Sequence, residues 1–111
     1  MTDTRRSVRL AACIRVRLTV RQDTVVEGRT ASIGRQGALV LSPIRFAKGT
    51  LLSIHNALTS QTARGCVVWL GIEEPAGIHR VGIEFIDDVP TFWGCEYEER
   101  LALTLTRETL E

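Results

Sequence analysis

The sequence predicts one mostly β domain, an antiparallel barrel or sandwich followed by a C-terminal helix. Three observations support this prediction: a length of 111 residues, 44% hydrophobic residues, and short strand-like segments at regular intervals without long helical patterns between them. A chain of this length has the usual size of a single domain, and its apolar content is enough for one packed core. Short strands separated by turns are typical of all-β sandwiches and barrels.

The first expected strand has the clearest alternation. Ile14, Val16, Leu18 and Val20 alternate with polar residues, as on a half-buried strand. After a turn at 21–23, further strands are expected over residues 24–31, 38–41, 50–55, 61–70 and 79–86. The connections at 32–36, 42–49, 56–60 and 71–77 hold residues that favour turns. Gly65 is a candidate bulge, because glycine inside a strand pattern often marks one.

The C-terminal segment fits either of two structures. Tyr97, Leu101 and Leu105 are spaced for one face of a helix. Leu101, Leu103 and Leu105 also alternate as they would on a strand. Glutamates at 96, 98 and 99 suit the first turn of a helix, where the macrodipole favours negative charge. We therefore expect a helix, with a strand as the alternative.

Charge and hydropathy exclude several classes of function. A formal net charge of +1 argues against binding of nucleic acid or anionic membranes by the overall field. No apolar run approaches the ~20 residues that span a bilayer, and residues 1–10 lack the apolar stretch of a signal peptide. We expect a cytoplasmic protein without membrane insertion. Cys13, Cys66 and Cys95 lack metal-ligand spacing, so we expect reduced thiols in or near the core.

The sequence gives little support for an enzyme. His55 and His79 lie in strand-like segments without an obvious catalytic partner, and Asp87-Asp88 is more typical of a solvated turn than of a metal pair. No glycine-rich phosphate loop ending in Lys-Ser or Lys-Thr is present. We therefore expect a binding module with no catalytic residue, no metal site and no cofactor.

Two segments are candidates for a ligand-binding site. The first is an arginine-rich arm, residues 1–10, in which Arg5 and Arg9 have the spacing Arg-x-x-x-Arg and Arg6 adds a third guanidinium. The second is the run 32–40, expected to form a tight turn that feeds a strand. Paired guanidinium groups suit phosphates and the O6/N7 edge of guanine, and small turn residues let a ligand reach backbone N–H groups. The alternative is a solubilising tail beside an ordinary glycine turn.

From about Arg5 to Phe85, the sequence resembles a PilZ domain, the bacterial receptor module for cyclic di-GMP. Arg5 and Arg9 match the family's Arg-x-x-x-Arg motif, and the run 37–40 matches what usually follows its second motif. Residues 65–69 and 81–85 look like the family's paired late strands. The resemblance implies a six-stranded antiparallel β-barrel with a C-terminal helix. The barrel domain would comprise residues 11–111, after a flexible arm of residues 1–10.

The second motif of the family, Asp/Asn-x-Ser-x-x-Gly, is degenerate in this chain. When the motif is anchored on Gly37, Ser32 stands at the Asp/Asn position and Gly34 at the serine position. A serine hydroxyl does not replace a carboxylate that accepts from guanine N1–H and N2–H₂ together. Loss of two such contacts would cost roughly 2–5 kcal/mol, which Arg35 could offset by binding a phosphate. The implied ligand-binding residues are Arg5, Arg6, Arg9, Ser32, Gly34, Arg35 and Gly37.

The resemblance implies a cyclic di-GMP-binding signalling module. The arm would become ordered on the barrel when the ligand binds, and a partner protein would read that change, because a lone domain has no output of its own. A homodimer is compatible with this scheme, and no nucleic-acid partner is expected. The alternative is a degenerate PilZ-like domain that binds protein only and not the nucleotide.

Overall fold

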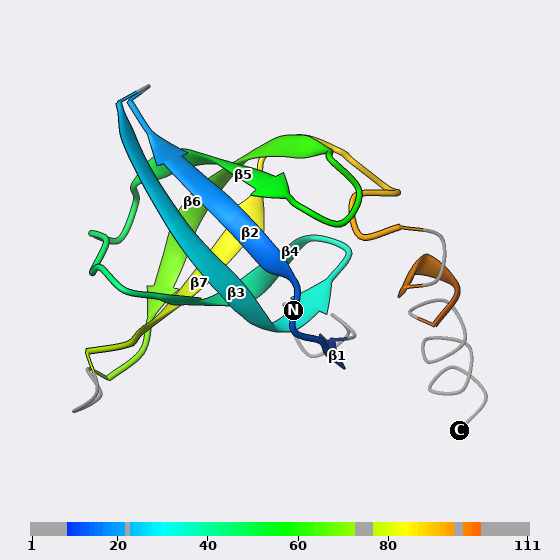
Figure 1. Ribbon diagram of the computed structural model, residues 1–111, viewed down its shortest axis with the longest axis horizontal. Helices are drawn as coiled ribbons and strands as arrows, with labels where there is room; N and C mark the ends of the chain where they lie inside the picture. The colour runs from blue at the N-terminus through cyan, green and yellow to red at the C-terminus, as the bar shows by residue number, and fades with distance from the viewer. Residues whose placement is uncertain (1–8, 22, 73–76, 95–96, 101–111) are drawn as a thin grey trace, which may run out of the picture.

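The computed structural model describes residues 9–21, 23–72, 77–94 and 97–100, and its strands close into a barrel (Figure 1). Six of them follow the order β3-β2-β5-β6-β7-β4, and β4 pairs back onto β3. All pairings are antiparallel, and β1 adds a short seventh strand beside β3. The predicted six-stranded barrel is therefore confirmed. The strands are β1 (Leu10–Ala11), β2 (Arg15–Val20), β3 (Thr24–Gly34), β4 (Gly37–Ser42), β5 (Leu51–Asn56), β6 (Thr62–Leu70) and β7 (His79–Phe85).

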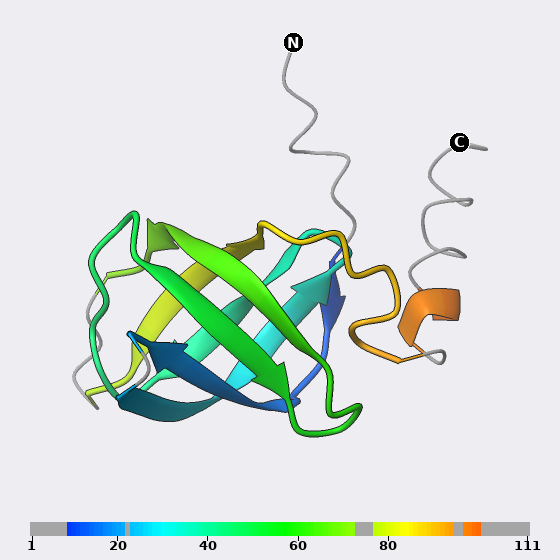
Figure 2. The same ribbon diagram turned by 90° about the horizontal axis from the view of Figure 1, so that it is seen from above.

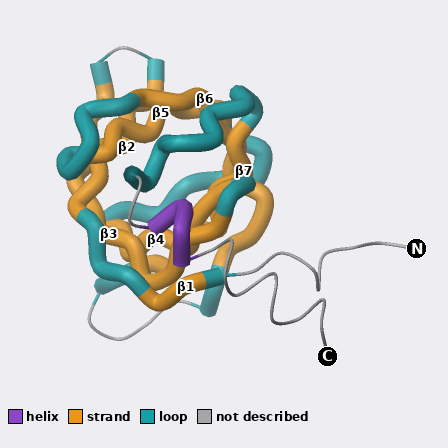
Figure 3. Tube along the Cα trace, turned by 90° about the vertical axis from the view of Figure 1, so that its right-hand side faces the viewer, coloured by secondary structure: helices purple, strands orange, loops and turns teal. Residues whose placement is uncertain are grey.

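The core fills the inside of this ring of strands, which Figure 3 shows nearly end-on. Val16 and Leu18 of β2 are buried as their alternation predicts. Phe92 and Trp93, which follow β7, are also fully buried. Their rings meet edge to face with centroids 4.7 Å apart, and Phe92 lies 4.9 Å from the ring of Phe85. Burial of a side chain of this size stabilises the fold by about 2–3 kcal/mol, so the segment after β7 belongs to the core.

Strand β3 is longer than predicted. It continues to Gly34, so the loop expected over residues 32–36 is a two-residue turn at Arg35 and Gln36. The strand continues because Ser32 and Ile33 pair with β1 on one side and with β4 on the other. The register of the β3–β4 pair shifts between Thr30 and Ser32.

The predicted bulge at Gly65 is wrong. Gly65 pairs regularly with Leu52 and Phe85, and the irregularity in β6 falls between Val67 and Trp69. Glycine is needed at 65 for a different reason: an added Cβ would lie 2.7 Å from a methyl group of Ile83. The bulge leaves both Val68 and Trp69 exposed, at 41% and 51%.

The C-terminal helix is confirmed, since residues 97–100 are helical. Figures 1 and 2 both place this helix beyond the end of the barrel that carries the β3–β4 turn. At the other terminus, Arg5 and Arg6 lie outside the described residues. Leu10, the last residue of the predicted arm, already pairs with Ile33.

The cysteine prediction is wrong for one residue. Cys13 is exposed and Cys66 is half-buried, both as free thiols, while Cys95 lies outside the described residues. Cys13 lies between β1 and β2, next to Ile14, which is buried. Within the described part of the chain, no helix has the length and apolar character needed to cross a membrane.

Candidate ligand-binding site

Strand β1 brings the end of the arginine-rich segment to the second motif. Leu10 pairs with Ile33 and Ala11 with Ser32, so Arg9 comes next in line beside Gly34. The Leu10 side chain packs against the core, which anchors this short strand, and Arg9 is exposed. Arg9 thus directly precedes the strand that pairs with the end of β3, whereas Arg5 and Arg6 lie outside the described residues.

The β3–β4 hairpin holds the remaining motif positions. Gly34 pairs with Gly37, and Arg35 and Gln36 form the turn between them. Both glycines are buried. A Cβ at Gly37 would collide with the carbonyl oxygen of Ile83, because β4 and β7 approach closely there. The motif glycine that this chain keeps is therefore required by packing, whether or not a ligand binds.

Ser32 lies in a row of residues on the outside of the barrel. The row crosses four strands through the pairs Ser32–Leu39, Leu39–Gly82 and Gly82–Trp69. It faces outward because neighbours along the strands, such as Ile33 and Ile83, point into the core. We call Ser32, Leu39, Gly82 and Trp69 the outer row. Trp69 covers the backbone of β7, since a Cβ on Gly82 would lie 3.0 Å from the Trp69 Cβ.

A carboxylate lies beside the turn in the adjacent row. Glu84 of β7 pairs with Gly37 on one side and with Cys66 on the other, and it is exposed. No ion pair or hydrogen bond of its side chain is found within the described part of the chain. Glu84 is therefore available to accept hydrogen bonds from a ligand over the hairpin.

Arg35 already has a partner in the C-terminal helix. Its Nε lies 3.6 Å from Oε1 of Glu98, with the Arg35 side chain 53% exposed and that of Glu98 17% exposed. The Glu98 N–H donates to the carbonyl oxygen of Gly94, four residues earlier, at 3.0 Å. Arg35 lies in the β3–β4 turn, and a carboxylate of the same chain engages it.

A second contact joins the turn to the C-terminal segment. The indole Nε1–H of Trp93 donates to the carbonyl oxygen of Gly34 at 2.8 Å, and this hydrogen bond is buried. A buried carbonyl left without its donor costs about 1–3 kcal/mol. The backbone of the turn and the core segment after β7 are therefore coupled.

A surface ion pair fixes the start of that segment. The guanidinium of Arg64 donates to Asp87, with Nη2 2.8 Å from Oδ1, and the backbone N–H of Arg64 donates to Oδ2 at 2.9 Å. These hydrogen bonds to Arg64 lower the pKa of Asp87. Asp87 is therefore ion-paired rather than part of a solvated turn.

His55 makes a cross-strand contact, and the described acidic residues do not gather into a metal site. His55 Nδ1 lies 2.8 Å from the hydroxyl of Thr62 on the neighbouring strand. No group of three or more His, Cys, Asp or Glu residues able to hold a metal ion is found there.

Comparison with known proteins identifies a family model and two similar structures. The model, described as the PilZ domain, matches residues 3–91. The inhibitor of motility of Bacillus subtilis (MotI/DgrA) is similar with 15% identity and a TM-score of 0.66, over 98% of this chain and 53% of that chain. The PilZ domain of YcgR from Escherichia coli, solved with c-di-GMP, is similar with 15% identity and a TM-score of 0.64, over 96% and 95%.

Because each of the two structures is 15% identical to this chain, the comparison shows a shared fold. The chain spans about half of the Bacillus protein, 53% of its length. No curated protein matches the chain.

Proposed function

Because the chain belongs to the PilZ domain family, we propose that it binds cyclic di-GMP and passes the signal to a partner protein. One observation supports this most: β1, which directly follows Arg9 of the first motif, pairs with the end of β3 that leads into the hairpin of the second motif. A relative of the same fold, the YcgR domain, was solved with c-di-GMP. The proposal includes a cytoplasmic location and the possibility of a homodimer.

The phosphates of the ligand are assigned to the arginine-rich segment. Arg9 is exposed beside Gly34, and Arg5 and Arg6 are proposed to complete the clamp. A guanidinium binds a phosphate through two parallel N–H donors, and such charge-assisted hydrogen bonds are about twice as strong as neutral ones. Binding through this segment is therefore expected to weaken as salt is added.

The guanines are assigned to the outer row and to Glu84. The half-exposed indole of Trp69 offers a flat face, and stacking of a base on an aromatic side chain is worth about 1–3 kcal/mol. Ser32 offers one uncharged hydroxyl oxygen, whereas a carboxylate offers two charged oxygens, one each for N1–H and N2–H₂ of guanine. Glu84 has such a carboxylate, with no competing partner in the described part of the chain. We assign to Glu84 the acceptor role that the degenerate motif lacks.

We assign to the C-terminal helix the step that signals ligand binding to the partner protein. The Glu98 carboxylate near Nε of Arg35 competes with a ligand phosphate for this guanidinium. An exposed ion pair of this kind is worth about 0.2–1 kcal/mol, so a doubly anionic ligand can displace it. Ligand binding would then release a helix contact, and the partner would recognise the freed surface.

A second candidate function is a protein-binding PilZ domain that does not bind the nucleotide. Two observations favour it: Ser32 and Gly34 depart from the second motif, and Glu98 engages Arg35. In that case the Arg35–Glu98 contact is permanent, and the outer row is a surface for protein.

Isothermal titration calorimetry with cyclic di-GMP separates the two candidates. We expect heat of binding for the wild type, loss of at least about tenfold in affinity for Arg9→Ala, and no change for Arg45→Ala. Arg45 is a matched control, because it is exposed in the 43–50 connection at the other end of the barrel (Figures 1 and 2). Absence of heat with wild type would support the protein-only function. Equal affinity of Arg9→Ala and wild type would remove the arm from the site.

A further inference from the structure

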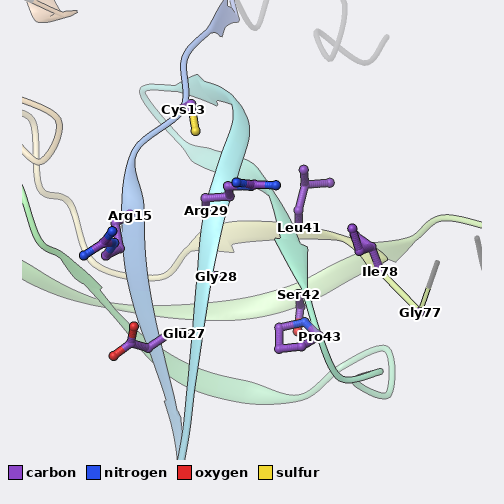
Figure 4. Close-up of a pocket in the computed structure, with 10 residues that line it drawn as sticks. All are labelled: Cys13, Arg15, Glu27, Gly28, Arg29, Leu41, Ser42, Pro43, Gly77 and Ile78. Carbon is purple, nitrogen blue, oxygen red and sulfur yellow. The ribbon is translucent and has the colours of Figure 1, made fainter.

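A cleft opens on the outer wall of the barrel, at a distance along the strands from the motif residues. Its volume is about 550 Å³, and residues of β2, β3 and β4 line it together with the end of the β6–β7 connection (Figure 4). Neither Arg9 nor the hairpin residues 32–37 line this cleft. Small-molecule sites have volumes of about 300–1,000 Å³, so the cleft is large enough for a compact ligand.

Two arginines form a cross-strand pair on the wall of the cleft. Arg15 of β2 pairs directly with Arg29 of β3, and both line the cleft. Like charges directly opposite on neighbouring strands destabilise a sheet. Figure 4 shows the Arg29 side chain extending from β3 toward Leu41, while Arg15 projects to the other side of β2. The two guanidinium groups therefore lie apart from each other.

The acidic residue that lines the cleft, Glu27, already has an ion-pair partner. Glu27 lines the cleft, but its carboxylate forms an ion pair with Arg17, in the next cross-strand pair, with Nη2 and Oε2 3.8 Å apart. Among the described residues, neither Arg15 nor Arg29 has a carboxylate within 4 Å. The cleft lining thus carries two arginines and one glutamate, and because Arg17 engages the glutamate, positive charge is in excess.

The rest of the cleft is apolar or backbone. Leu41 of β4 is the cross-strand partner of Arg29, and Ile78 lies on the far side of Leu41 from Arg29 (Figure 4). Gly28 leaves its backbone uncovered by a side chain, and glycine is required there because a Cβ would lie 2.6 Å from the carbonyl oxygen of Leu41. A charged side chain beside apolar side chains suits a ligand with one anionic end and one apolar body.

We propose that this cleft is a second ligand site, which binds a small organic anion. The phosphate or carboxylate group of the ligand lies at Arg29, with Arg15 turning toward it, and the apolar body lies against Leu41 and Ile78. Guanidinium matches either anion through two parallel hydrogen bonds. A bound anion also offsets the repulsion between the opposed arginines. The site does not depend on cyclic di-GMP.

The test is an NMR titration of the full chain with phenyl phosphate, benzoate, inorganic phosphate and phenol. Phenyl phosphate or benzoate should cause saturable shifts of the backbone amides in 13–15, 27–29 and 41–42. Whichever of the two binds more tightly identifies the anionic group. Arg29→Gln should weaken that binding roughly 10- to 100-fold. Arg21→Gln, an exposed arginine in the β2–β3 turn, is the control and should bind like wild type.

Three results would overturn the proposal. These are no saturable shift with either organic anion, equal affinity of wild type and Arg29→Gln, or inorganic phosphate binding as tightly as phenyl phosphate. A dispersed spectrum of Arg29→Gln checks that the variant is folded. A second variant, Leu41→Ser, should weaken phenyl phosphate binding but leave the response to inorganic phosphate unchanged. Arg29→Gln should also leave cyclic di-GMP titrations unchanged, which separates this site from the proposed function.

Discussion

The contact between Arg35 and Glu98 gives the most specific prediction about the proposed site. If the carboxylate competes with ligand phosphates for Arg35, then Glu98→Gln removes the competitor and retains the shape of the side chain. Cyclic di-GMP should bind more tightly to this variant than to wild type. Glu99→Gln is the matched control, because Glu99 lies next to Glu98 on the same helix, is exposed, and forms no ion pair with a described residue.

The size of the effect follows from the geometry of the ion pair. The two atoms are 3.6 Å apart, and the Arg35 side chain is half-exposed. Such pairs contribute about 0.2–1 kcal/mol, which converts to a gain in affinity of about 1.4- to 5-fold. Screening should reduce the gain as salt rises, because solvent-exposed charges interact less strongly at high ionic strength.

Calorimetric titrations of the three proteins at low and high salt measure this gain. The expected order of affinity at low salt is Glu98→Gln above wild type, with Glu99→Gln equal to wild type. If Glu98→Gln binds no more tightly than Glu99→Gln, the carboxylate does not compete with the ligand and the proposed path through the helix is refuted.

Three further predictions concern packing, the outer row and the surface ion pair. Gly37→Ala should lower the free energy of unfolding in urea by about 1–3 kcal/mol, because its Cβ would meet the carbonyl oxygen of Ile83; a value unchanged from wild type would contradict the close approach of β4 and β7. Trp69→Ala should weaken cyclic di-GMP binding by about 1–3 kcal/mol, while Val68→Ala, at the neighbouring exposed position, should not. Asp87 has a lowered pKa, so its pairing stabilises the fold above the pKa of the unfolded chain, about 3.9, and this stabilisation is lost as pH falls through the folded-state pKa. Asp87→Asn should therefore reduce the loss of stability in acid unfolding, and a pH profile identical to that of wild type would count against the pair.

Much of the barrel is predictable from the sequence because its strands alternate. The period of two from Ile14 to Val20 places Val16 and Leu18 in the core, as the structure confirms. The end of β3 is not predictable in this way. Ser32 and Gly34 are residues typical of turns, but Ser32 pairs with both β1 and β4, and Gly34 pairs with Gly37 of β4, which keeps them in the sheet. Local preference is overridden there by tertiary hydrogen bonding.

The bulge in β6 shows why a glycine can mislead. Gly65 suggested a bulge by its residue type, but it is small because a side chain of β7 needs the space. The bulge itself falls at Val68, a β-branched residue that carries no bulge signal. The extra residue at the bulge shifts the strand by one position, so both Val68 and Trp69 are exposed.

The candidate site likewise contains residues that the sequence identifies and residues that it does not. Arg9 and the positions Ser32, Gly34 and Gly37 are identified from motif spacing, and the structure brings them together. Trp69 and Glu84 are not, because only the strand register shows that they lie beside Gly82 and Gly37 on the outer face. The engagement of Arg35 by Glu98 joins residues from opposite halves of the chain, so no local pattern could indicate it.

One measurement tests the central claim most directly: a titration of the ¹⁵N-labelled full chain with cyclic di-GMP, followed through its amide and indole resonances. Our account expects saturable shifts that begin at Arg9 and Leu10, extend to the backbone of Ser32, Gly34 and Gly37, and include the indole N–H of Trp69. A spectrum that stays unchanged up to millimolar nucleotide, or shifts confined to the opposite end of the barrel around Arg45, would contradict it.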